Sequence, residues 1–183
     1  VLQPGESFII AQDGINHYED PNGSENSPVD LSDADYESYV DNEDNTDTDA
    51  PGVPNLVRMH YTGGFDWLTP VFGGAYVIFK VDDFSTLETA TNPESSSSTE
   101  YLKIPVDLVI DGVEALVDEN AGDFKRIPAS IDAGFTYCNG MYVGESVRRK
   151  VSDTINGRYV LQDTNNSTED FEVLSTPTPR SFE

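Results

Sequence analysis

The 183 residues carry a formal charge of −24 and are 37% apolar, which suits one domain with a modest core. Such a negative field disfavours binding to nucleic acid, because phosphate contacts need lysine and arginine, and it also disfavours anionic membrane surfaces. The single cysteine, Cys138, excludes an intrachain disulfide and a multi-cysteine metal site.

Short runs of β-branched and aromatic residues, separated by glycine and proline turn signals, predict strands in chain order at residues 7–11, 55–61, 74–81, 101–104, 108–117, 146–151 and 158–163. The apolar run 74–81 predicts a central buried strand. Asn156 and Gly157 predict a tight turn between the last two strands. Many short strands with almost no helical periodicity predict a mainly β chain folded as a single β-sandwich domain over residues 1–183.

Three segments interrupt this pattern. Residues 19–54 are an acidic loop insertion, in which only residues 31–39 resemble a short helix. Residues 86–100 include four consecutive serines and predict a mobile loop. Residues 172–183 contain two prolines and predict an extended tail.

The motif at residues 2–7, Leu-Gln-Pro-Gly-Glu-Ser, resembles the start of a strand in lamin-tail-type immunoglobulin-like domains. Residues 146–150 and 170–179 resemble later segments of that fold. A closer resemblance is to uncharacterised Bacteroides-type surface lipoproteins of gut bacteria, through residues 30–37, 51–56, 125–130 and 161–171. It implies an extracytoplasmic protein at the outer membrane, held by a lipid outside this chain, and it implies no activity.

The same resemblance bears on the first residues. In lamin-tail-type domains several strands precede the Leu-x-Pro-Gly-Glu segment, so the chain is expected to be the C-terminal portion of a domain that lacks its N-terminal strands. The alternative is a complete domain whose own edge strand is residues 7–11.

The densest group of oxygen ligands lies at residues 41–49 and contains Asp41, Asp44, Asp47 and Asp49. Ca²⁺ takes six to eight oxygen ligands, and aspartates on a loop can supply several. The run lacks the glycine and glutamate positions of an EF-hand. Calcium is therefore the one candidate cofactor, and a solvated acidic loop without an ion is the alternative.

A second polar group includes Asn165 and Asn166, which are candidates for a shelf that binds sugar beside an aromatic ring. Tyr61, Phe65 and Trp67 are the candidate rings. The alternatives are that the asparagines close their own backbone turns and that Trp67 is a core residue.

Enzyme motifs are absent from the sequence. It contains no G-x-S-x-G elbow and no glycine-rich nucleotide loop. His17 and His60 have no metal-type spacing and are interpreted as structural, and Cys138 as a buried or turn thiol. Arg148, Arg149, Lys150 and Arg158 are expected to pair with carboxylates across a sheet, or to form a docking face for an acidic partner.

The sequence thus favours a non-enzymatic cell-surface binding or accessory module for glycan or peptide capture in nutrient uptake. A structural subunit that assembles with other cell-envelope proteins is one alternative. A calcium-dependent adhesion or hydrolase-associated domain is the other.

Overall fold

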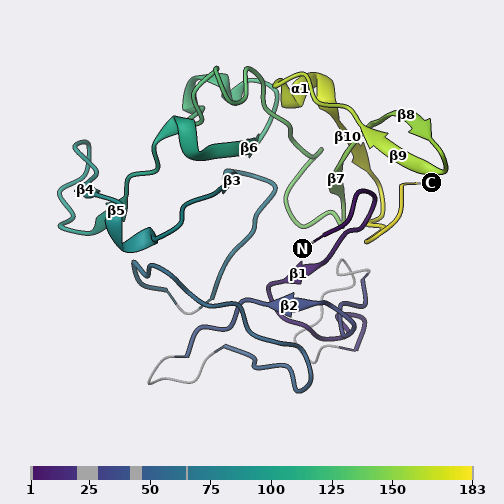
Figure 1. Ribbon diagram of the computed structural model, residues 1–183, viewed down its shortest axis with the longest axis horizontal. Helices are drawn as coiled ribbons and strands as arrows, with labels where there is room; N and C mark the ends of the chain where they lie inside the picture. The colour runs from purple at the N-terminus through teal and green to yellow at the C-terminus, as the bar shows by residue number, and fades with distance from the viewer. Residues whose placement is uncertain (1, 20–28, 42–46, 65, 183) are drawn as a thin grey trace.

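The computed structural model describes residues 2–19, 29–41, 47–64 and 66–182 (Figure 1). The described chain is mainly β, as predicted, with a single α-helical turn, α1 (Ser167–Asp170). Its strands are β1 (Ile10–Ala11), β2 (Tyr36–Glu37), β3 (Gly74–Phe79), β4 (Thr89–Thr91), β5 (Glu100–Leu102), β6 (Val109–Ala115), β7 (Ser146–Arg149), β8 (Val151–Ile155), β9 (Arg158–Leu161) and β10 (Phe171–Leu174). The 3-10 turns are Phe84–Thr86, Val106–Leu108 and Ala121–Phe124.

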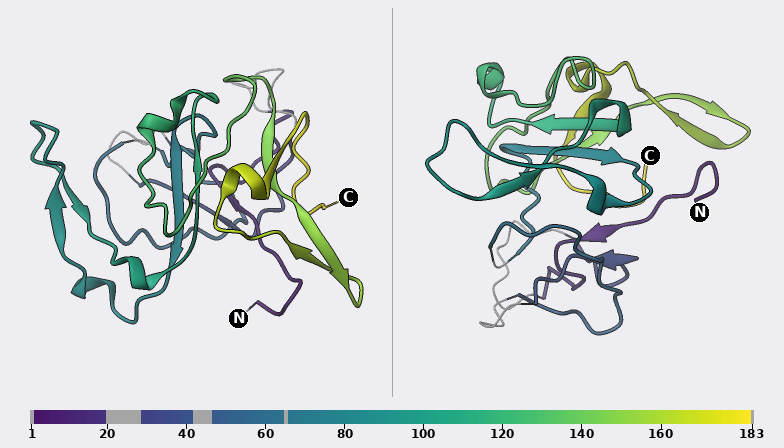
Figure 2. Two further views of the ribbon diagram at one scale, coloured as in Figure 1. Left: turned by 90° about the horizontal axis from the view of Figure 1, so that it is seen from above. Right: turned by 60° about the vertical axis from the view of Figure 1, so that its left-hand side comes forward.

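The strands pair as five two-stranded sheets. β1 and β2 are parallel, whereas β3–β6, β4–β5, β7–β10 and β8–β9 are antiparallel. The β3–β6 sheet lies between the region of α1 and the layer formed by β1 and β2 (Figures 1 and 2). The hairpins β4–β5 and β8–β9 project from opposite sides of the molecule (Figures 1 and 2).

The N-terminal layer has its own small core of Ala11, Ala34, Ala50 and Val53. Three of these residues lie in the segment 19–54, so its described part builds the layer as well as carrying charge. The helix predicted at residues 31–39 is wrong, because β2 forms there and pairs with β1. Tertiary pairing with β1 has overridden the local helical signal.

The predicted strand at 74–81 exists as β3, but it is not a central buried strand. β3 has β6 as its partner in a two-stranded sheet, and Ile78 keeps 65% of its surface exposed. A continuous apolar run is typical of a strand covered on both faces. Within the described residues, β3 lacks that cover.

The other two segments predicted to be irregular, residues 86–100 and 172–183, also contain strand residues. The serine-rich segment 86–100 forms most of the β4–β5 hairpin, with its turn closed by the Ser95 and Ser97 hydroxyls, which accept main-chain N–H groups at 3.1 Å. The tail predicted from residue 172 begins as β10, whose Glu172 pairs with Arg148 of β7. The strand expected at 55–61 is absent apart from one bridge at Asn55.

The Asn-Gly turn is confirmed. Asn156 and Gly157 have φ values of 54° and 77°, as a two-residue type I′ hairpin turn requires. This turn joins β8 to β9. The strand before this hairpin, β7, does not join it. β7 pairs with β10 in a separate two-stranded sheet.

Carboxylates occupy much of the interior. The largest fully buried side chains are Glu37, Glu114, Asp132 and Asp170. A buried carboxylate is costly unless hydrogen bonds satisfy it. Each of these four carboxylates accepts main-chain N–H groups from loops. Each therefore fixes the path of a segment that has no strand pairing to hold it.

Glu114 shows the arrangement in full. Its carboxylate accepts the N–H groups of Arg126 and Ile127 at 2.8 Å and the Arg126 Nε–H at 2.9 Å. Lys125 Nζ lies 3.6 Å away. Burial alone would raise the pKa of Glu114, but these hydrogen bonds outweigh it and lower the pKa.

Asp132 and Asp170 fix the segment around α1. Asp132 accepts the N–H of Ser167 at 2.8 Å and its hydroxyl at 2.5 Å. Asp170 accepts the N–H of Thr164 at 2.8 Å and its hydroxyl at 2.9 Å. Burial would raise the pKa of Asp170, yet these bonds lower it.

Candidate functional site

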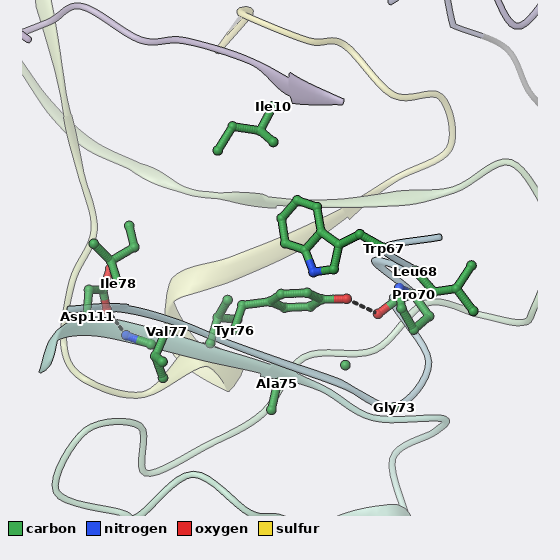
Figure 3. A pocket seen from close by; sticks show the side chains of 13 residues that line it. Ile10, Trp67, Leu68, Pro70, Gly73, Ala75, Tyr76, Val77, Ile78 and Asp111 are labelled. Carbon is green, nitrogen blue, oxygen red and sulfur yellow. Dashed lines mark hydrogen bonds between the residues drawn. The ribbon is translucent and has the colours of Figure 1, made fainter. Parts of the chain in front are cut away.

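A cleft of about 670 Å³ lies along β3 and faces the N-terminal layer. Its walls come from Ile10 of β1, the segment 67–70, β3 and residues 111–113 of β6. Figure 3 shows Trp67 and Tyr76 close together on the side of β3 that faces Ile10. The cleft is therefore built where β3 lacks the cover that its apolar sequence predicts.

Tyr76 and the segment before it hold the cleft in shape. The Tyr76 hydroxyl donates to the main-chain oxygen of Pro70 at 2.9 Å (Figure 3). Burial raises the pKa of Tyr76 to about 12, although Arg126 opposes the shift. Gly74 allows this contact, because a Cβ there would collide with the Tyr76 ring. Tyr76 is thus a neutral structural donor.

A second hollow of about 720 Å³ adjoins the first, and the two share Ile10, Leu68 and Pro70 in their walls. Asp13, His17 and Glu145 are among its other lining residues. The shared wall makes the two hollows neighbouring parts of one groove. We call this the β1–β3 groove.

Carboxylates gather beside this groove. Gln12 donates its side-chain N–H to Asp66, whose other carboxylate oxygen is buried with no hydrogen-bond partner among the described residues. Burial raises the pKa of Asp66, and the charge of Asp47 adds to the shift. Burial, followed by the charges of Asp66 and Asp47, raises the pKa of Asp13 to about 6.

A third, smaller hollow of about 290 Å³ shares Trp67 in its wall with the cleft on β3. Tyr61, His60 and Arg58 line it. The Arg58 guanidinium lies 4.2 Å from the centre of the Tyr61 ring, and the Tyr61 hydroxyl donates to the main chain of Gly64. The structure therefore brings the predicted Tyr61 and Trp67 to one hollow. Phe65 lies outside the described residues.

Trp67 lies in the walls of two of the three hollows. Its side chain lines both the cleft on β3 and the hollow at Tyr61, and 40% of its surface is exposed. The alternative that Trp67 is a core residue does not hold within this chain. An indole with both an apolar face and accessible surface suits contact with an apolar or planar ligand.

Asn165 and Asn166 are not part of this arrangement. Asn166 is the N-cap of α1, where its side-chain oxygen accepts the N–H of Thr168 at 3.2 Å. Asn165 has a φ of 55°, and its main-chain oxygen accepts the N–H of Ala133 at 2.7 Å. Neither lines any of the three hollows described above. Of the two roles considered, the structure assigns them the turn-closing one.

The predicted calcium ligands are only partly described, because Asp44 lies in the segment 42–46, outside the described residues. Asp47 accepts the N–H groups of Val40 at 2.6 Å and Thr48 at 2.8 Å, and Asp49 accepts from the side chain of Asn55 at 3.0 Å. Within residues 2–19, 29–41, 47–64 and 66–182, no group of three or more His, Cys, Asp or Glu side chains is placed to hold a metal ion. For Asp41 and the others, ion binding stays a prediction.

The pairing with carboxylates that was predicted for the basic residues is confirmed for Arg148 and Arg149, whereas Lys150 donates to the main-chain oxygen of Glu169 at 2.6 Å. Arg148 pairs with Glu172 at 2.7 Å across β7–β10, and Arg149 pairs with Asp111 at 2.7 Å. Cys138 is buried, as predicted, and burial raises the pKa of its thiol, with Glu145 adding to the shift. No described helix has the length and apolar character needed to cross a membrane.

Sequence reasoning missed Ile10, Tyr76 and Asp13 as groove residues. Ile10 and Tyr76 appeared only as members of predicted strands. No motif marked Asp13 as a site residue, because the carboxylates that lie near it in space, Asp47 and Asp66, are far away along the chain. The exposure of an apolar strand depends on its partners in space. A mainly apolar run with one tyrosine does not indicate whether the strand is covered.

Comparison with known proteins places the chain in context. The model of a family described as a protein of unknown function, DUF4876, matches residues 3–178. A solved structure of a DUF4876 family protein from Bacteroides thetaiotaomicron VPI-5482 is similar, with a TM-score of 0.80 and 35% sequence identity. The match covers 93% of this chain and 49% of that one, so this chain spans about half the length of that relative. No curated protein matches.

Proposed function

The chain belongs to the DUF4876 family, and we propose that it is a non-enzymatic binding or accessory module that holds a glycan or peptide against Trp67. One observation carries the proposal: the exposed Trp67 ring forms a wall of two hollows, one of about 670 Å³ and one of about 290 Å³. Ligand sites are concave and mainly apolar, with a few polar groups. The cleft on β3 has this character.

The non-enzymatic part of the proposal is supported by the state of the polar side chains in that cleft. Tyr76 donates to Pro70, and Asp111 pairs with Arg149. A general acid or base needs to be available to the reacting group. These two side chains are already engaged in holding the walls.

The proposed setting is the bacterial cell surface. We place the module at the outer membrane, attached through a lipid outside these residues, on the strength of its resemblance to Bacteroides-type surface lipoproteins. The finer fold assignment, an immunoglobulin-like sandwich of the lamin-tail type, belongs to the same proposal. Its support is the mainly β fold together with the motif at residues 2–7.

A second candidate function is a structural subunit of a surface assembly. The β8–β9 hairpin favours it, because apolar side chains are exposed along both strands: Val151, Ile155, Tyr159, Val160 and Leu161. Exposed apolar surface of this kind often marks a protein interface. This candidate predicts that the native protein co-purifies with another envelope protein and binds no small ligand.

The calcium-dependent alternative has a separate test. Chelation should lower the melting temperature and expose residues 41–49 to proteolysis if an ion is bound there. An unchanged melting temperature and an unchanged cleavage rate would remove this alternative.

The binding function is tested with Trp67→Ala. We expect it to weaken binding by tenfold or more in a calorimetric screen against soluble oligosaccharides and peptides, since aromatic anchors contribute about 2 kcal/mol or more. Tyr101→Ala is the matched control, because Tyr101 is 48% exposed on β5 and lines none of the hollows described. Equal binding by both variants would refute a site at Trp67. Unfolding of Trp67→Ala alone would assign that residue a structural role.

A further inference from the structure

One edge of β3 pairs with no strand among the residues that the structure describes. Within the described residues, β3 pairs with β6 alone, and the outer edge of β6 is met in part by Thr136, which bridges Ala115. In an antiparallel pair, alternate residues direct their N–H and C=O groups away from the partner strand. The free edge of β3 therefore offers main-chain donors and acceptors to a further strand.

The main chain of β3 borders the cleft, as do residues 111–113 of β6. All six positions from 73 to 78 line it. Because successive side chains of a strand point to opposite faces, six consecutive lining residues mean that the main chain of β3 forms a wall. Six residues at about 3.3 Å each give roughly 20 Å of edge, which is enough for a strand of five or six residues.

The side chains around this edge favour a peptide over a glycan. Ile10, Trp67 and Ile78 present apolar surface, and the polar Tyr76 and Asp111 are already bonded to the protein. A sugar needs several side-chain partners for its hydroxyl groups. A peptide strand needs main-chain partners, which the β3 edge provides, and apolar contacts for alternate side chains.

The charges of the groove also limit the kind of peptide that it can bind. No lysine or arginine lines either hollow of the β1–β3 groove, whereas Asp13 and Glu145 line the second one. With a net charge of −24, a second copy of the chain would bring like charges together. A basic partner would be attracted over the whole surface.

We propose that the β1–β3 groove binds an extended peptide with alternating apolar and basic side chains, which pairs as an added strand with the free edge of β3. This inference rests on the proposed binding function and deepens it by naming the ligand class. The apolar side chains of the peptide contact Trp67, Ile10 and Ile78. Its basic side chains face the carboxylates of the groove.

The probe is a fluorescent peptide of about nine residues in which lysine and valine alternate, the length of an ordinary strand. Binding is measured by fluorescence anisotropy to the whole chain. Two further probes carry N-methyl groups on every valine amide or on every lysine amide. Each leaves the charge unchanged and blocks one edge of the peptide. We expect one of them to bind about tenfold more weakly than the parent.

Two matched substitutions test whether the peptide contacts the groove. Ile78→Lys places a positive charge in the groove, and Ile110→Lys places one on the neighbouring strand, outside the groove lining. The two isoleucines are equally exposed, at 65% and 67%, so both variants should fold. We expect Ile78→Lys to weaken binding of the parent peptide tenfold or more and Ile110→Lys to change it less than twofold.

The outcomes separate this inference from the proposed function. Equal binding of all three probes, or equal effects of the two lysine variants, would show nonspecific attraction and overturn the peptide site. If an oligosaccharide binds in a manner dependent on Trp67 and the peptide does not, the binding function stands and the peptide inference falls. If neither binds, both fall.

Discussion

Two regions of the chain place carboxylates away from water, and they do so with opposite electrostatic results. In the C-terminal region, Glu114 and Asp170 are fully buried, and hydrogen bonds from loop N–H groups lower their pKa values. In the N-terminal layer, Asp13 and Asp66 are only partly buried, and their pKa values are raised. Burial raises the pKa of all four carboxylates. Hydrogen bonds to Glu114 and Asp170 outweigh that effect, whereas nearby negative charges add to it at Asp13 and Asp66.

This difference assigns the two groups to different roles. The satisfied carboxylates stabilise the loops that carry α1 and the segment 125–127. The repelling carboxylates lie beside the β1–β3 groove and weaken the layer that forms its wall. Groups that destabilise a fold are often found at functional sites. Three predictions test the comparison, from the largest expected effect to the smallest.

Glu114→Gln should cause the largest loss of stability. The amide loses the negative charge that holds Arg126 and turns an N–H₂ group toward main-chain donors. Breaking a buried pair of this kind costs about 3 kcal/mol. Urea unfolding at pH 7 measures it. Glu119→Gln, at an exposed position nearby, should change the free energy of unfolding by less than about 0.5 kcal/mol. Similar values for both variants would contradict the stabilising role of Glu114.

Asp170→Asn should cost about 2 kcal/mol at pH 7, because the amide cannot accept all the bonds that Thr164 and Asn166 donate. The pKa of Asp170 is lowered in the folded state, so its contribution is present above its ordinary value of 3.8 and is lost as the pH falls through the folded pKa. The gap between variant and wild type should therefore shrink toward pH 3. A gap that stays constant with pH would show that the charge of Asp170 is not what matters.

Asp13→Asn should have the smallest effect and the opposite sign. The pKa of Asp13 is raised from 3.8 to about 6, so its ionisation opposes folding increasingly from pH 4 to pH 6 and fully above that range. Removing the charge should stabilise the chain by about 1 kcal/mol at pH 7.5, after allowance for solvent screening. At pH 4 the two proteins should melt at nearly the same temperature. Destabilisation at pH 7.5 would mean that Asp13 makes a favourable contact.

Local signals predicted part of the fold well. The Asn156–Gly157 turn formed as expected, because a left-handed turn depends on two adjacent residues. β6 formed within its predicted range, and Arg148 found a carboxylate across the sheet. By contrast, the segment 31–39 had a helical signal that pairing with β1 overrode. Asn166 was a candidate either for a sugar-binding shelf or for closing a backbone turn, because both roles suit the same residue type, and it caps α1.

The sequence by itself determined a mainly β chain, its Asn156–Gly157 turn and its negative field. These properties depend on neighbouring residues or on composition. The tertiary structure alone decided which carboxylates are satisfied and that Ile10 and Trp67 line one groove. It also decided that, among the described residues, β3 pairs along one edge only and keeps Ile78 exposed. Such features depend on donors and partner strands that are distant along the chain, and a linear pattern of residues does not encode their distances in space.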